Sequence, residues 1–114
     1  MTSPKVAPRH PSSQKFHNLL DELAFMHDQK MADYGTDTDP FDNVRQSALE
    51  YDVPPWVGAR IRGKDKSNRI KNFYRRKKVD NEPIRDSLLD EAAYALIALI
   101  LLEEETKGDG FHES

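Results

Sequence analysis

The sequence predicts an all-α protein, a helical bundle of three long helices and one short helix. Apolar residues recur at three- and four-residue spacing in long stretches, and proline or glycine residues separate these stretches. No segment alternates between apolar and polar residues for long enough to predict a β-strand. Hydrophobic residues make up 37% of the 114 residues and charged residues 32%, a balance that suits amphipathic helices and gives a small domain reason to oligomerise.

The first long helix is expected to begin at Ser12 or Ser13, which can cap its N-terminus, and to end near Gly35. Its apolar residues lie at helical spacing: Phe16, Leu19, Leu20, Leu23, Met26 and Met31. Glu22 borders this apolar stripe, so it is expected to reach either solvent or the acids of the last helix. Residues 1–12 are rich in proline and are expected to form a disordered arm.

Two further helices are expected before the last one. Asp42 can cap a short helix, which Pro54 and Pro55 end. A long third helix begins at about Pro55, and Gly58 and Gly63 are weak points where it is expected to bend or to split.

The last helix runs from Asn81 to about Leu102, and the rest of the chain is organised around it. Asn81 can cap this helix, and Pro83 stands in the first turn, where a proline loses no hydrogen bond. From Ala92 to Leu102 every residue but Tyr94 is aliphatic, so the helix is expected to be buried all round, by other helices or by a second copy of the chain. It is too short for a membrane span, which needs about 20 apolar residues.

Residues 13–106 are therefore expected to form one domain, completed as a homodimer, with a disordered tail at residues 107–114. The chain has no cysteine, which excludes disulfides, thiolate metal sites and cysteine nucleophiles. Its first residues contain no apolar core typical of a signal peptide, so a cytoplasmic location is expected, without a membrane partner.

Three carboxylates recur at every fourth position in the first half of the last helix: Glu82, Asp86 and Asp90. This spacing places them on one face, where like charges repel. A divalent cation would neutralise them, and carboxylate oxygens are the ligands that Mg²⁺ and Mn²⁺ prefer. The alternative is a solvated face near a helix N-terminus, where the helix dipole favours acids.

Basic residues are concentrated in and just after the third helix, since ten of the 17 cations lie between Arg60 and Lys78. Lys66 and Arg69 share one face of the third helix. Cations beside carboxylates suit a nucleoside triphosphate, whose metal binds the acids while lysine and arginine neutralise the phosphates. The alternatives are a nucleic-acid-binding face or a solvated face. The net charge of -3 argues against a polynucleotide partner.

Four segments resemble one family in their order and content: Lys30–Gly35 (KMADYG), Asp39–Asn43 (DPFDN), Lys64–Ile70 (KDKSNRI) and Glu82–Ala95. Together they look like the phage-borne nucleotide-modification-associated proteins. These are similar to the MazG-like, all-α nucleoside triphosphate pyrophosphohydrolases. The likeness covers roughly residues 14 to 103.

The resemblance implies a Mg²⁺-dependent enzyme of phage nucleotide metabolism that splits a (deoxy)nucleoside triphosphate into monophosphate and pyrophosphate. It also implies assembly as a homodimer or homotetramer and, for a phage-encoded protein, a location in the host cytoplasm. It implies that Glu22, Asp86 and Asp90 are catalytic and bind the metal together with Glu82. Phosphate-binding residues would be Lys30, Lys66 and Arg69, and the base or sugar pocket would include Asp33, Tyr34 and Asn43. The MazG-like pattern has a third acid on the first helix that is missing here, so the alternative is a non-catalytic accessory protein that binds nucleotides or nucleic acid through the basic third helix.

Overall fold

The computed structural model describes residues 8–34, 39–76 and 81–108, and for residues 31–34 and 81–83 it describes the backbone alone. These residues form four helices and no strand: α1 (Pro11–Tyr34), α2 (Asp42–Glu50), α3 (Pro55–Arg75) and α4 (Asn81–Gly108). The prediction of an all-α fold with three long helices and one short helix is confirmed. The remainder of the predicted arm, residues 1–7, and of the predicted tail, residues 109–114, lies outside the described residues.

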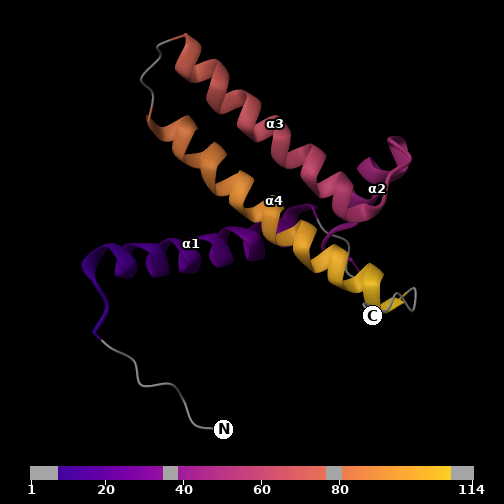
Figure 1. The fold of residues 1–114 in the computed structure, drawn as a ribbon, viewed down its shortest axis with the longest axis horizontal. Helices are drawn as coiled ribbons and strands as arrows, with labels where there is room; N and C mark the ends of the chain where they lie inside the picture. Colours follow the sequence, from indigo (N-terminus) through magenta and orange to yellow (C-terminus); the bar gives the residue numbers. More distant parts are fainter. Residues whose placement is uncertain (1–7, 35–38, 77–80, 109–114) are drawn as a thin grey trace, which may run out of the picture.

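Helices α3 and α4 lie side by side as an antiparallel pair, and α2 packs against the first half of α3 (Figure 1). Helix α1 crosses α4 instead of running alongside it (Figure 1). The molecule is therefore an α2–α3–α4 unit with α1 laid across one side of α4, and it is not a regular up-and-down bundle.

The hydrophobic core lies where α2 and the first half of α3 meet the second half of α4. Its buried residues are Phe41, Val44, Ala59, Ala98 and Leu101, with Trp56, Tyr94 and Ile97 packed against them. Removing these apolar side chains from water is the main favourable contribution to the fold. The core also fixes the side of α4 that faces α2 and α3, and so fixes where the polar residues between its apolar positions lie.

Gly58 allows α2 and α3 to pack closely. A Cβ atom at this position would lie 2.8 Å from the Cβ of Ala48 and 3.0 Å from the carbonyl oxygen of Val44. At Gly63, a Cβ atom would lie 3.3 Å from the Cβ of Tyr94. Helix α3 continues through both glycines, so the predicted split does not occur, and these glycines serve helix packing instead.

The start of α2 differs from the expectation that Asp42 is its N-cap. Phe41 occupies that position and Asp42 is the first helical residue. Asp39 stabilises this turn instead, because its carboxylate accepts a hydrogen bond from the backbone N–H of Phe41 at 3.0 Å and another from Arg45 Nε at 2.7 Å. An acid two residues before the N-cap position can therefore serve the same purpose through an Asx turn.

The start of α1 and the end of α4 lie beyond the expected boundaries. Helix α1 begins at Pro11, so it includes the last two residues of the predicted arm, and α4 continues to Gly108. Among the described residues, none of the four helices combines the length and the apolar run that crossing a membrane requires.

A single chain does not bury α4 all round. Leu89, Ala98 and Leu101 are buried, whereas Leu96 and Leu99 are exposed on the other side of the helix. The first half of α1 is also exposed at its apolar positions, Phe16, Leu19 and Leu20. The helix was expected to be covered by other helices of the same chain or by a second copy of the chain. The other helices of the same chain cover only one side of it.

Candidate functional site

A cavity of about 270 Å³ opens between all four helices. Its apolar lining is Leu23, Met26, Pro40, Phe41, Val44, Ala93 and Ile97, and its polar lining is His27, Lys30, Asn43, Arg62, Asp90 and Tyr94. One side is therefore formed by the edge of the hydrophobic core and the other by charged and hydrogen-bonding groups. A pocket with mainly apolar walls and a few polar groups is typical of small-molecule sites.

Asp90 joins three helices at this cavity. Its carboxylate on α4 lies 2.8 Å from Lys30 Nζ on α1 and 3.3 Å from Lys66 Nζ on α3. The Asp90 side chain is 16% exposed, whereas that of Lys30 is 52% exposed. Burial by itself would raise the pKa of Asp90, but the hydrogen bond and charge of Lys30, followed by those of Lys66, lower it below its ordinary value. Asp90 is therefore a carboxylate held between two cations.

Arg62 links α2, α3 and α4 on the same cavity. Its Nε donates a hydrogen bond to the hydroxyl of Tyr94 at 3.1 Å, and another of its nitrogens donates to the hydroxyl of Ser47 at 3.1 Å. The Ser47 hydroxyl in turn donates to the carbonyl oxygen of Asn43 at 3.1 Å. A guanidinium group has five N–H donors, so Arg62 retains donors for a ligand.

An aromatic contact borders the cavity between α1 and α2. The rings of His27 and Phe41 lie with their centroids 5.9 Å apart, and both side chains line the cavity. Tyr94 lines it from α4. Aromatic walls of this kind suit a flat ligand such as a nucleobase.

The structure brings four of the residues predicted from the sequence together. Lys30, Asn43 and Asp90 line the cavity, and Lys66 binds Asp90. Arg69 and Asp86 are exposed on α3 and α4 respectively, and neither lines the cavity. The side chains of Asp33, Tyr34 and Glu82 lie outside those that the structure describes.

Glu22 does not lie with the acids of α4. Both of its carboxylate oxygens accept hydrogen bonds from Arg85, each at 2.6 Å. This charge-assisted bidentate bond is the main cause of the lowered pKa of Glu22. Glu22 therefore ties α1 to α4 through an ion pair with Arg85, the residue that precedes Asp86 in the sequence.

Glu22, Asp86 and Asp90, the members of the predicted magnesium set whose side chains the structure describes, do not come together as a group of three ligands. Among the side chains that the structure describes, in residues 8–30, 39–76 and 84–107, no three His, Asp or Glu groups are placed so that they could hold one ion. Their carboxylate chemistry suits a hard cation, but Glu22 and Asp90 are engaged by cations of the protein. The described side chains consequently fit an anionic or polar ligand better than a preformed metal site.

The sequence analysis did not identify Arg62 and Tyr94 as site residues, although their spacing from Lys66 and Asp90 points to them. Arg62 and Lys66 are four residues apart on α3, and Asp90 and Tyr94 are four residues apart on α4. On antiparallel helices these equal spacings align Lys66 with Asp90 and Arg62 with Tyr94. The pattern becomes informative only once α3 and α4 are known to be an antiparallel pair.

Comparisons of the chain with protein-family models, with curated proteins and with solved structures found no match. The functional assignment therefore depends on the cavity, on the charged groups around it and on the resemblance of the sequence motifs.

Proposed function

We propose that the protein binds a (deoxy)nucleoside triphosphate, with the base in the cavity and the phosphates at its cationic rim. The observation that carries this proposal is the convergence of Lys30, Asn43 and Asp90 on one cavity from α1, α2 and α4. The resemblance implies that Lys30 binds the phosphates, that Asn43 borders the base or sugar pocket and that Asp90 binds the metal. They are widely separated in the sequence, so their proximity in the fold is independent support.

The base fits the enclosed part of the cavity. Small-molecule pockets have volumes of roughly 300 to 1,000 Å³, so about 270 Å³ suits one part of a nucleotide better than the whole. Phe41 and Tyr94 offer ring surfaces, and Asn43 offers an amide that can hydrogen-bond a base edge. The remaining sugar and phosphates would then lie outside, toward the more exposed Lys30.

The phosphates fit the two lysines that now hold Asp90. Lys30 and Lys66 lie within 2.8 Å and 3.3 Å of the same carboxylate, so two ammonium groups are already positioned for an anion. A triphosphate carries more charge than one carboxylate and competes for both groups. Binding would exchange the protein's carboxylate for phosphate oxygens and would release Asp90.

Cleavage to monophosphate and pyrophosphate, with Mg²⁺, is the activity that the resemblance adds to this binding proposal. A second candidate is a nucleotide-binding accessory protein without hydrolase activity. The observation that favours it is the engagement of Glu22 by Arg85 and of Asp90 by two lysines, which leaves these acids paired with cations.

One experiment tests both candidates. Each nucleoside and deoxynucleoside triphosphate is added with and without Mg²⁺, while the melting temperature and the released pyrophosphate are measured. Binding raises the melting temperature, and pyrophosphate release then separates the enzyme from the accessory protein. No shift with any triphosphate at millimolar concentration would refute the proposal.

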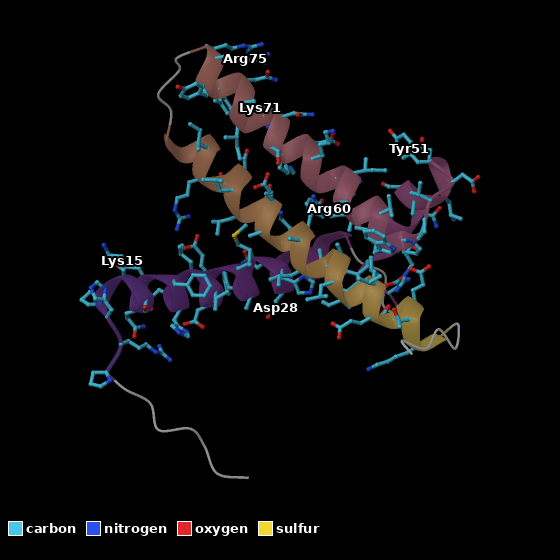
Figure 2. The ribbon with its side chains drawn as sticks, in the orientation of Figure 1. Lys15, Asp28, Tyr51, Arg60, Lys71 and Arg75 are labelled. Atoms are coloured by element: carbon cyan, nitrogen blue, oxygen red, sulfur yellow. The ribbon has the colours of Figure 1, made fainter. Side chains whose placement is uncertain are left out.

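A matched pair of variants locates the site. Lys30→Met removes a cation at the cavity, whereas Lys15→Met removes one at the far end of the same helix (Figure 2). We expect Lys30→Met to weaken triphosphate binding by about tenfold or more, since a charge-assisted hydrogen bond contributes about 1.5–3 kcal/mol. Lys15→Met is expected to bind like the unchanged protein, and equal losses in both variants would place the phosphates elsewhere.

A further inference from the structure

An apolar seam runs along the outward face of α4. Its residues follow spacings of four, three, four and three: Leu88, Ala92, Ala95, Leu99 and Leu102. All five are exposed, with exposed fractions of 51% for Leu88, 52% for Leu99 and 40% for Leu102. Alternating spacings of three and four are the heptad pattern by which two helices pack together in coiled coils. The seam residues are exposed, so they form a different face of α4 from the buried Leu89, Ala98 and Leu101.

A groove of about 730 Å³ runs beside this seam. Leu88, Ala92 and Ala95 of the seam line it from α4, and the basic residues Arg60, Lys64 and Lys71 line it from α3. The groove therefore has an apolar side on α4 and a basic side on α3. Figure 2 shows Arg60, Lys71 and Arg75 in succession along α3.

We propose that a second copy of this chain covers the seam, with the two α4 helices antiparallel across a two-fold axis. In this register Leu88 packs against the partner subunit's Leu99, and Ala92 packs against the partner subunit's Ala95. Two crossing helices are closest at their crossing point and diverge toward their ends. Small alanines at the centre and leucines at both ends fit that geometry, and a two-fold axis makes each contact occur twice.

Charge selects the antiparallel orientation over the parallel one. Glu103 and Glu105 follow the end of the seam, while Glu104 between them pairs with Arg45 of the same chain. In a parallel pair these acids would face the same acids of the partner, and such juxtaposed like charges are unfavourable. In the antiparallel pair they pass the end of α3 that carries Lys71 and Arg75, because Lys71 and Leu88 line the same groove. Acidic and basic segments of the two copies then face each other twice.

Size measurement tests the proposed surface. Light scattering at tens of micromolar is expected to give twice the chain mass of 13.1 kDa. Leu99→Asp should give the single-chain mass with an unchanged helical circular dichroism spectrum, because Leu99 is half-exposed in the single chain. The matched control is Leu49→Asp, which changes an exposed leucine of α2 outside the seam and should remain a dimer. A single-chain mass for the unchanged protein, or a dimer that survives Leu99→Asp, would overturn the proposal.

Cross-linking tests the orientation without depending on the stability of any seam variant. The chain has no cysteine, so Ala92→Cys and Ala95→Cys each introduce a single thiol. A disulfide requires Cα atoms about 4.4–6.8 Å apart. The antiparallel register predicts a covalent dimer when the two variants are refolded together and oxidised, and little covalent dimer from either variant alone. Efficient cross-linking of one variant with itself would show a parallel pair, and no cross-linking in any sample would show that the seam is not the interface.

Discussion

Lys30 of α1 and Asp90 of α4 are 60 positions apart in the sequence, yet Lys30 Nζ lies 2.8 Å from the Asp90 carboxylate. This contact has two possible meanings for the carboxylate row of α4. If Asp90 is a structural acid, its removal harms the fold. If it is a metal ligand in the free protein, its removal relieves repulsion along the row. The ion pairs with Lys30 and Lys66 favour the first meaning in the absence of ligand.

Asp90→Asn is expected to lower the stability of the ligand-free protein. The change leaves Lys30 and Lys66 without their carboxylate, and we expect a loss of about 1–2 kcal/mol. This is less than the roughly 3–5 kcal/mol of a fully buried pair, because Lys30 is half-exposed. Urea denaturation followed by circular dichroism measures the difference.

Asp86→Asn is the matched control, because it makes the same change one turn earlier on the exposed face. Its effect is expected to stay within about 0.5 kcal/mol, as for most surface substitutions. Equal effects of the two changes, or a higher melting temperature for Asp90→Asn, would contradict the structural role of Asp90.

The lowered pKa of Asp90 predicts how stability depends on pH. A carboxyl group with a lower pKa in the folded state stabilises the fold fully above its unfolded value of about 3.9. This contribution is lost as the pH falls through the lower, folded value. We therefore expect little change attributable to Asp90 between about pH 7 and 5, and a loss below about pH 4.

Denaturation midpoints of the unchanged protein and of Asp90→Asn, measured across this pH range, check this prediction. The decline at low pH should be smaller in the variant. It should not vanish, because the pKa of Glu22 is also lowered, by Arg85. A decline of the same size in both proteins would show that Asp90 titrates alike in the folded and unfolded states.

The fold class could be predicted because two of its signals lie in the local sequence. These are the helical spacing of apolar residues and the prolines and glycines between helices. The helices predicted on either side of Gly35, of Pro54 and Pro55, and of the segment between Arg75 and Asn81 are confirmed in type and approximate position. The roles of Gly58 and Gly63 were not predictable in this way, since a glycine that weakens an isolated helix and one that admits a neighbouring helix have the same local sequence. Only the contacts with Ala48 and Tyr94 distinguish them.

Gly58→Ala is expected to destabilise the protein although alanine favours a helix by about 1 kcal/mol over glycine. The new methyl group would meet the Cβ of Ala48 at 2.8 Å and the backbone of Val44 at 3.0 Å, so α2 would have to move. Overpacking of this kind costs about 1–3 kcal/mol. Gly63→Ala is the control, since its methyl group would meet only the Cβ of Tyr94, at 3.3 Å.

Thermal denaturation of both glycine variants provides the measurement. The melting temperature of Gly58→Ala should lie below that of the unchanged protein, and that of Gly63→Ala should be close to it. The reverse order would mean that helix propensity outweighs packing between α2 and α3.

The candidate site was predicted in part, and the limit has a physical cause. The row of acids identified Asp90, and the basic run identified Lys66, because both patterns lie within one helix. The partners of these groups depend on how α1 crosses α4, which local sequence does not specify. Glu22 was expected to reach either solvent or the acids of α4, but it forms an ion pair with Arg85, one residue before Asp86.

Arg62→Lys is expected to weaken triphosphate binding while the helices remain folded. Lysine cannot donate simultaneously to Tyr94 and Ser47 as the planar guanidinium does. The hydrogen bonds that connect α2 with α4 through residue 62 are therefore lost. Loss of one or two such hydrogen bonds costs about 1–2 kcal/mol of stability. Arg60→Lys, an exposed position of the same helix outside the cavity, should change neither quantity. Binding isotherms and urea denaturation of both variants make the comparison, and unaltered affinity in Arg62→Lys would remove Arg62 from the site.

Two ion pairs, Glu22 with Arg85 and Lys30 with Asp90, hold α1 across α4, while the apolar residues in its first half stay exposed. Attraction between solvent-exposed charges weakens as salt rises, whereas the α2–α3–α4 core depends on apolar burial. We therefore expect α1 to open more readily than this core, and without global unfolding. Its backbone amides should exchange with deuterium faster than those of α3, and faster still in concentrated sodium chloride. A ligand that bridges Lys30 and Asn43 would slow this exchange.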